Sequence, residues 1–278
     1  GSQPISNYDA LVGGALDVEP DKFYFSMPGG AGKFTFDHTR KPVRLRTDDI
    51  EILQHPFEGT PTLGHYPTLN DYEWKIKTPD GTIYTFQSAD KHTVVNTCQS
   101  DSHISERQNA WHLVKIEKGN DEINFEYKLE DVEYETTYSE SKKFKVISVN
   151  VEGNTGGGQS ATSPDPCNIT NTILSKRLDK ITTNNGYVVE FIVDENNQRL
   201  DLTGSHALEE IVVTKDGQLV KRVRLNQDYF GINKKLKLES IDQLADDDSG
   251  DFIQLYDFTY FENQTFPAIK SNQQDYWG

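Results

Sequence analysis

The sequence predicts an all-β protein, an array of consecutive antiparallel β-hairpins that forms a large twisted or curved sheet. One loose unit occurs five times: an apolar strand, an Asp/Asn/Gly turn, and a second strand that often ends in an aromatic residue. Aromatic residues make up 11% of a chain whose hydrophobic content is only 35%, which suits twisted antiparallel sheets with one wet face. Helical periodicity is essentially absent, with at most one turn at 205–210. A β-sandwich is the alternative fold.

The clearest unit covers residues 178–191. Leu178 and Ile181 mark the first strand, and Asn184-Asn185-Gly186 is the turn, because Asn and Gly accept the positive φ angles of tight hairpins. Val189 and Phe191 then alternate with polar neighbours, the two-residue period of a strand with one buried face.

The other four units follow the same plan. Their turns contain Pro79-Asp80-Gly81, Gly119-Asn120-Asp121, Lys215-Asp216-Gly217 and a longer acidic loop near 246–251. The units themselves span 74–86, 111–127, 208–225 and 236–260.

The remaining segments complete the order of the chain. Residues 1–16 are expected to be an N-terminal tether, and two alternating Phe strands within 21–37 form a hairpin around a glycine loop. That loop is not a phosphate cradle, because Gly32-Lys33-Phe34 lacks the hydroxyl residue of a P-loop and a strand follows it. Residues 43–53 give two short strands, 55–70 form a Pro/Gly/Thr-rich loop, and 88–109 are polar and irregular.

One domain is expected from residue 17 to residue 278. The Gly-, Ser- and Pro-rich segment 152–168 lacks periodicity and is predicted to be a flexible loop. It could divide the domain into 17–151 and 169–278. A long hairpin insertion is favoured over a domain break, because the hairpin pattern continues on both sides.

The charge of the chain argues against two classes of partner. Twenty-eight basic and 44 acidic residues give a net charge of −16, which repels phosphate backbones and anionic lipid. Neither nucleic-acid binding nor direct membrane insertion is expected, and no run of 18 apolar residues is present. The opening Gly1-Ser2-Gln3 suggests a chain that begins just past a removed leader. The final aromatic residues suggest that a longer protein continues beyond Gly278.

The sequence points to no catalytic, cofactor-binding or metal-binding residues. The seven histidines show no HxxxH or HExxH spacing, so a zinc protease is unsupported. Ser100-Asp101-Ser102-His103 is adjacent only in sequence, whereas a catalytic triad is assembled in space. The 246–251 loop is acidic but lacks EF-hand spacing, so a solvated hairpin tip is favoured over a calcium site. Cys98 and Cys167 are either a disulfide or two free thiols.

Glycan recognition is a further alternative. Glycoside hydrolysis needs two carboxylates in a cleft, and the sequence does not single out a pair among its 44 acidic residues. Trp74, Tyr84 and Trp111 could stack on sugar rings. These aromatics also fall on the core pattern of the repeat, so packing is the favoured role.

Several segments resemble the Rhs/YD-repeat proteins, in the degenerate form found in large surface or secreted proteins of Bacteroidetes. The segments that carry the resemblance are Asp17 to Phe25, Gly30 to Phe34, Asp80 to Phe86 and Gln274 to Gly278. The resemblance covers roughly residues 15–278.

The resemblance implies a sheet of consecutive hairpins that spirals into the wall of a hollow shell. Such shells enclose or display a variable C-terminal domain, which carries the activity. The expectation is therefore a non-enzymatic structural module of an exported protein, extracellular or on the outer cell surface. Its partners would be downstream repeats or a C-terminal domain of the same polypeptide, with a surface protein or a glycan as further options. The alternatives are a carbohydrate-binding or glycan-processing β-sandwich and, more weakly, a protein-adhesion surface that uses open sheet edges.

Overall fold

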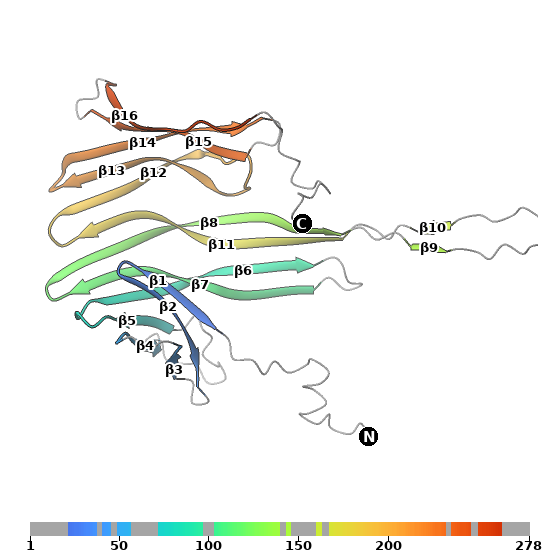
Figure 1. Ribbon diagram of the computed structural model, residues 1–278, viewed down its shortest axis with the longest axis horizontal. Helices are drawn as coiled ribbons and strands as arrows, with labels where there is room; N and C mark the ends of the chain where they lie inside the picture. The colour runs from blue at the N-terminus through green and yellow to red at the C-terminus, as the bar shows by residue number, and fades with distance from the viewer. Residues whose placement is uncertain are drawn as a thin grey trace, which may run out of the picture. The chain divides into compact units, whose positions relative to one another are not determined.

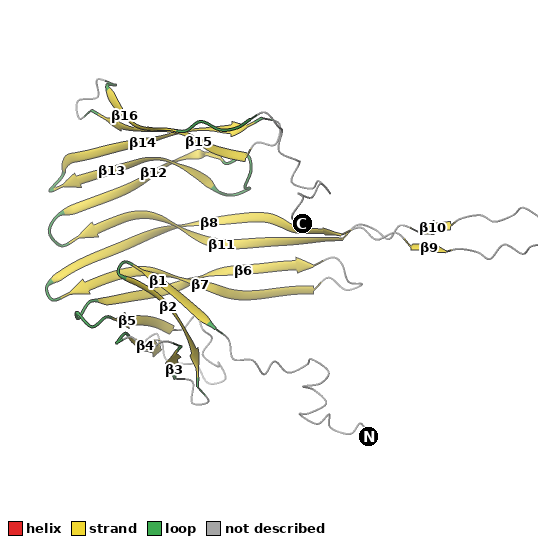
Figure 2. Cartoon of the chain, viewed as in Figure 1, coloured by secondary structure: helices red, strands yellow, loops and turns green. Residues whose placement is uncertain are grey.

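A computed structural model describes residues 22–37, 41–45, 49–56, 72–96, 103–139, 143–145, 160–162, 167–231, 235–245 and 250–262. These residues form sixteen β-strands and contain no helix, so the all-β prediction is confirmed (Figure 2). The one helical turn allowed for 205–210 does not form, because strand β13 begins at His206.

The strands follow one another along the chain and pair mostly with their sequence neighbours (Figure 1). Their bounds are β1 Phe23–Met27, β2 Gly30–Phe36, β3 Pro42–Arg44, β4 Glu51–Pro56, β5 Tyr72–Lys77, β6 Ile83–Asn96, β7 His103–Lys118, β8 Asp121–Ser139, β9 Lys143–Lys145, β10 Ser160–Thr162, β11 Cys167–Thr183, β12 Tyr187–Gln198, β13 His206–Lys215, β14 Gln218–Phe230, β15 Lys235–Leu244 and β16 Phe252–Asp257. The described strands fall into three sheets, with orders β1-β2-β3, β10-β9 and β16-β15-β14-β13-β12-β11-β8-β7-β6-β5-β4. Every pairing whose register is resolved is antiparallel.

The predicted turn residues take the backbone conformations that hairpins require. Gly81, Gly119, Gly186 and Gly217 all have positive φ. At the β11–β12 turn, the Gly186 amide donates to the Thr183 carbonyl at 3.1 Å, which closes the turn. Short-range turn chemistry therefore sets the order of the strands.

Internal contacts divide the chain into two compact units. Unit 1 comprises 1–87 and 113–122, and unit 2 comprises 88–112 and 123–278. Strands β6, β7 and β8 contribute residues to both units.

Unit 1 contains an aromatic cluster. Phe34 on β2 stacks on Phe23 of β1 with ring centroids 5.2 Å apart, and both rings pack on Trp74 of β5. Phe36 closes the cluster edge-on to both phenylalanines. Trp74 is only 5% exposed, and the small β1-β2-β3 sheet therefore buries its aromatic face against β5.

Two polar anchors accompany this cluster in unit 1. The buried Tyr84 hydroxyl donates to the Pro28 carbonyl at 2.6 Å, which ties the glycine-loop hairpin to β6. In the β5–β6 turn, Asp80 accepts hydrogen bonds from Lys118, Thr78 and Thr82. The hydrogen bond from Lys118 is the main reason that the pKa of Asp80 lies well below its usual range.

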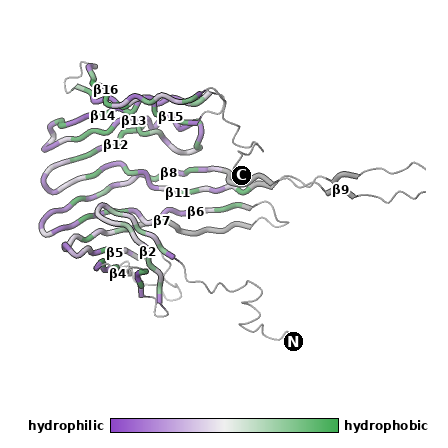
Figure 3. The backbone as a smooth tube through the Cα atoms, viewed as in Figure 1, coloured by the Kyte–Doolittle hydropathy of each residue, from purple (hydrophilic) through white to green (hydrophobic). Residues whose placement is uncertain are grey.

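Hydrophilic and hydrophobic residues are interspersed along the meander of unit 2, strands β11 to β16 (Figure 3). The register of the strands assigns them to two chemically different faces. Cross-strand neighbours place one set of apolar residues on a single face, which we call the apolar ladder. It consists of Phe125, Ile181, Val189, Phe191, Ile211, Val213, Val223, Leu225, Ile241 and Tyr256. The opposite face carries ion pairs such as Lys180 to Glu190, 3.1 Å apart.

The longest-range strand pairing in unit 2 closes part of the sheet on itself. Strand β11 pairs with β8 on one side, and its residues Ile169 to Leu174 also pair with Lys91 to Asn96 of β6. Because β6, β7 and β8 are already neighbours, β11 completes a four-stranded ring. This corrects the expectation that 88–109 is irregular, since β6 extends to Asn96 and β7 begins at His103.

Several sequence predictions lie wholly or partly outside the described residues. The 1–16 tether and the residues after 262 are among them, as are Cys98 and most of the acidic 246–251 loop. Within 152–168, the structure describes only β10 and the start of β11.

Replacing Phe34 with alanine should destabilise the fold by about 3–5 kcal/mol, because a buried ring is lost from the aromatic cluster. Urea denaturation followed by tryptophan fluorescence measures this change in the free energy of unfolding. Tyr24→Ala is the control, because Tyr24 lies on the neighbouring strand β1 but is 74% exposed. A control cost as large as that of Phe34→Ala would contradict the assignment of the core.

Candidate functional site

Strand β16 is an exposed apolar edge. It pairs with β15 from Ser240↔Asp257 to Leu244↔Phe252, and no described strand pairs with its other side. All six of its residues are exposed, including Ile253 at 68% and Tyr256 at 62%. Phe258, Tyr260 and Phe261 follow it and are also exposed.

The composition of this edge is unusual for a strand that faces water. Natural edge strands are protected by charges, proline, bulges or a covering element, because their free N–H and C=O groups attract other strands. On β16, Phe252 lies opposite Leu244 on one face. Ile253 and Tyr256 lie on the other face, because the register shifts between Ile241 and Asp242, so both faces carry apolar residues. Strand β16 is therefore a surface suited to strand addition.

One buried carboxylate with two arginine partners stabilises the polar face of the unit 2 meander. Glu210 on β13 is buried and accepts hydrogen bonds from Arg222 at 2.6 Å and from Arg224 at 2.8 and 2.9 Å. Burial alone would raise the pKa of Glu210, but these hydrogen bonds outweigh it and the pKa is lowered. The negative charge of Glu210 is therefore balanced by Arg222 and Arg224, and these ion pairs join β13 to β14.

A second buried carboxylate, Glu130 on β8, joins three strands. Its oxygens accept from Arg177 at 2.7 Å and Ser205 at 3.3 Å, and one lies 3.0 Å from Nδ1 of His206. Serine, histidine and a carboxylate therefore meet, but the carboxylate lies between the other two. A nucleophilic serine needs the histidine as its own base, so this arrangement is structural.

The Glu130 cluster anchors the loop between β12 and β13. Within that loop, Arg199 pairs bidentately with Asp201 at 3.0 Å, and Asp201 also accepts the amide of Leu236 on β15. Glu133 on β8 forms a bridge with Thr203. Gly204 permits this approach, because a Cβ there would collide with the carbonyl oxygen of Asp131.

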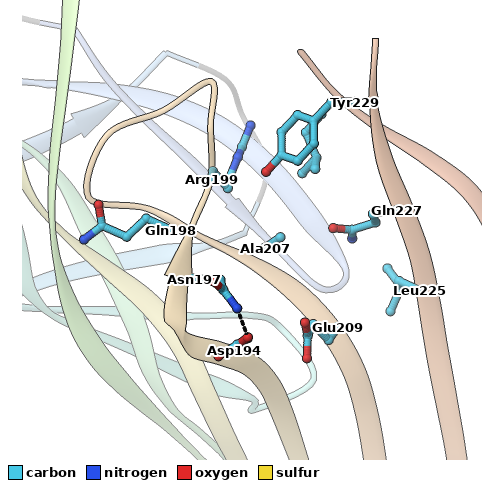
Figure 4. A pocket seen from close by; sticks show the side chains of 10 residues that line it. Asp194, Asn197, Gln198, Arg199, Ala207, Glu209, Leu225, Gln227 and Tyr229 are labelled. Atoms are coloured by element: carbon cyan, nitrogen blue, oxygen red, sulfur yellow. Dashed lines mark hydrogen bonds between the residues drawn. The ribbon is translucent and has the colours of Figure 1, made fainter. Parts of the chain in front are cut away.

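This loop forms one wall of a pocket of about 200 Å³ (Figure 4). Its lining combines apolar and polar side chains. The pocket is lined by Asp194, Asn197, Gln198, Arg199, Ala207, Glu209, Leu225, Gln227, Tyr229 and Leu236. Because these residues come from β12 to β15 and the loop, no single stretch of sequence contains the site.

Several polar groups that line the pocket are held in place by hydrogen bonds. Tyr229 Oη accepts the Leu200 amide at 3.1 Å, and Gln227 donates to the Leu208 carbonyl at 2.8 Å. Asp194 accepts from the Asn196 amide and from the Asn197 side chain, and these bonds lower its pKa. The Glu209 carboxylate makes no hydrogen bond or ion pair with any described residue.

The aromatic residues considered for sugar stacking have packing roles. Trp74 and Tyr84 are buried in unit 1, and Trp111 is half-buried. Of these residues, Trp74 belongs to the aromatic cluster and Tyr84 holds Pro28. The packing interpretation is thus confirmed for Trp74 and Tyr84. The sequence did not indicate Tyr229, which lines the pocket.

Each histidine whose side chain the structure describes has a polar neighbour. His92 contacts Asn171 at 2.9 Å, His112 contacts Asp90 at 2.7 Å, and His206 contacts Glu130. Within the described part of the chain, no group of three or more His, Cys, Asp or Glu side chains is placed to hold a metal ion. The side chains of Ser100 to His103 and of both cysteines lie outside it.

No protein-family model, curated protein or solved structure significantly matches the chain. Among the described residues, no helix has the length and apolarity to span a bilayer.

Replacing Glu210 with glutamine should cost about 1–3 kcal/mol at neutral pH, because charge-assisted hydrogen bonds to Arg222 and Arg224 are weakened. The folded-state pKa is lowered, so this stabilisation is complete above the unfolded pKa of about 4.3 and is lost as pH falls below it. Chemical denaturation from pH 7 to pH 3 should show the wild-type and variant proteins converging in stability.

Glu190→Gln is the matched control for that series. Glu190 lies on the same face and pairs with Lys180, but its side chain is 44% exposed. The expected cost is below about 1 kcal/mol. Equal costs for both variants would show that burial of Glu210 contributes nothing.

Replacing Gly204 with alanine should destabilise the protein more than replacing Gly217 does. Both glycines have φ near +80°, so either change costs about 1–2 kcal/mol in backbone strain. Only Gly204 adds a collision with Asp131, whereas nothing lies near Gly217. Thermal unfolding of the two variants measures the difference, and equal melting temperatures would contradict the docking of the loop on β8.

Proposed function

We propose that this chain is a non-enzymatic structural module, a wall of consecutive hairpins within a larger cell-surface or secreted protein of the Rhs/YD-repeat kind. The exposed apolar strand β16 is the observation that carries the proposal. In this role the wall is continued by further hairpins at β16. The activity belongs to a C-terminal domain of the same polypeptide that the wall encases or presents.

The edge supports this role because an added strand satisfies two needs of β16 at once. Its free backbone groups gain hydrogen-bond partners, and its exposed side chains gain neighbours on both faces. The apolar ladder already extends to this strand, since Tyr256 lies opposite Ile241. A further hairpin would extend the ladder in the same pattern.

The meander supports the same role through its modular construction. From β11 to β16 each strand pairs with the strand that follows it in sequence. Cross-strand pairs such as Lys180–Glu190 and Arg224–Glu210 recur along the polar face. Hairpins of this kind lengthen a sheet without requiring a new core, as in other repeat architectures.

The gene that encodes this chain provides the test. We expect its reading frame to continue past the codon for Gly278 into further hairpin segments. Hydrogen exchange of the β16 amides should be at least about tenfold slower in the whole gene product than in the 278-residue chain, because a following strand protects them.

The amides of β13 are the internal control, because β12 and β14 already flank that strand in the 278-residue chain. Their exchange should be the same in both proteins. A frame that ends close to Gly278, or β16 amides that exchange equally fast in both proteins, would exclude the wall function.

A further inference from the structure

The pocket between β12 and β15 is rich in hydrogen-bond acceptors. The Glu209 carboxylate makes no bond with a described residue, and the Asp194 carboxylate retains acceptor capacity. The amides of Gln227 and Asn197 donate to Leu208 and Asp194, which leaves their carbonyl oxygens as acceptors.

Some donors around the same pocket are already engaged. Two nitrogens of Arg199 bind Asp201, which also neutralises its charge. The remaining donors are the Tyr229 hydroxyl hydrogen, the Gln198 amide nitrogen, whose oxygen accepts from Gly204, the second N–H groups of Gln227 and Asn197, and the unused N–H groups of Arg199. Donors and acceptors are therefore both available, so hydrogen bonding alone does not select the ligand.

The charge of the pocket selects a cation. Asp194 is ionised at neutral pH because its pKa is lowered by the hydrogen bonds from Asn196 and Asn197. Glu209 adds a second carboxylate, and the Arg199–Asp201 pair cancels itself. The net charge of −16 for the chain adds an attractive field for cations at longer range.

The shape of the pocket selects a cation with an aliphatic stem. Ala207, Leu225 and Leu236 supply apolar lining, and Tyr229 adds an aromatic ring. Figure 4 shows Tyr229 at one end of the pocket, and Asp194 and Glu209 at the other. Lysine and arginine side chains pack their methylene groups on apolar surface while the charged end binds carboxylates or an aromatic face.

We propose that this pocket binds the end of a lysine or arginine side chain from another polypeptide segment. The charged group lies between Asp194 and Glu209, and the methylene stem lies on Ala207, Leu225 and Leu236. This inference does not depend on the wall function. A neutral sugar would leave the charges of Asp194 and Glu209 uncompensated.

Methyl-labelled NMR on the 278-residue chain tests the site directly. The probes are N-acetyl-arginine methylamide, N-acetyl-lysine methylamide and, as the neutral isostere of arginine, N-acetyl-citrulline methylamide. We expect saturable shifts of the Ala207, Leu225 and Leu236 methyl signals with the two cations and none with citrulline. Binding should weaken when salt is raised, because the carboxylates are accessible to solvent.

Glu209→Gln preserves the shape of the side chain and should weaken cation binding at least about threefold. Glu126→Gln is the matched control, because it removes the same charge from an exposed position on β8 and should leave binding unchanged. Equal affinities for both variants, or equal binding of citrulline and arginine, would overturn the proposal.

Two further probes identify the source of the cation. Agmatine carries the same guanidinium and stem without a peptide backbone, and tighter binding of the blocked arginine would support a polypeptide source. Tighter binding of agmatine would overturn that assignment in favour of free amines. Glucose is the neutral polyol probe, and binding of glucose with higher affinity than either cation would overturn the selection by charge.

Discussion

Backbone pairing between strands that follow one another in sequence is the constraint on which this structure depends. No described side chain is fully buried, and the buried apolar residues are few for so many strands. Backbone hydrogen bonds between strands and cross-strand side-chain pairs therefore supply the stabilisation that a deep core supplies in a globular domain. Turn glycines such as Gly186 and Gly217 fix where the backbone hydrogen bonding of each hairpin begins.

The two faces of the meander divide the remaining stabilisation between them. The apolar ladder removes side chains from water on one face. On the opposite face, ion pairs such as those of Glu210 with Arg222 and Arg224 join neighbouring strands. Neither face suffices alone, because half-buried apolar pairs and partly exposed ion pairs each contribute little. The apolar pairs and ion pairs recur at regular spacing, so their combined contribution to stability is significant. The same spacing lets the pattern repeat from one hairpin to the next.

The sequence predicted the local structure well. The turns at Gly81, Gly119, Gly186 and Gly217 and the all-β class follow from residues that are close together in the chain. Long-range features were missed for a physical reason. The pairing of β6 with β11 depends on residues about 80 positions apart, and polar residues such as His92 and Asn171 carry no apolar alternation to reveal it. The pocket combines residues of four strands and one loop, so Tyr229 and Glu209 had no common sequence signal.

The ring closed by β6 and β11 also sets an order of events during folding. The contact between His92 and Asn171 spans 79 residues, whereas Asn226 and Ser240 in the meander are only 14 apart. Closing the longer loop costs more chain entropy and is slower, because the contacts that reward it form last. Hairpins β12 to β16 therefore form soon after they are synthesised, but β6 must wait for β11. Until then one edge of the far half of β6 lacks the strand that later pairs with it, and during this interval the chain is most open to mispairing.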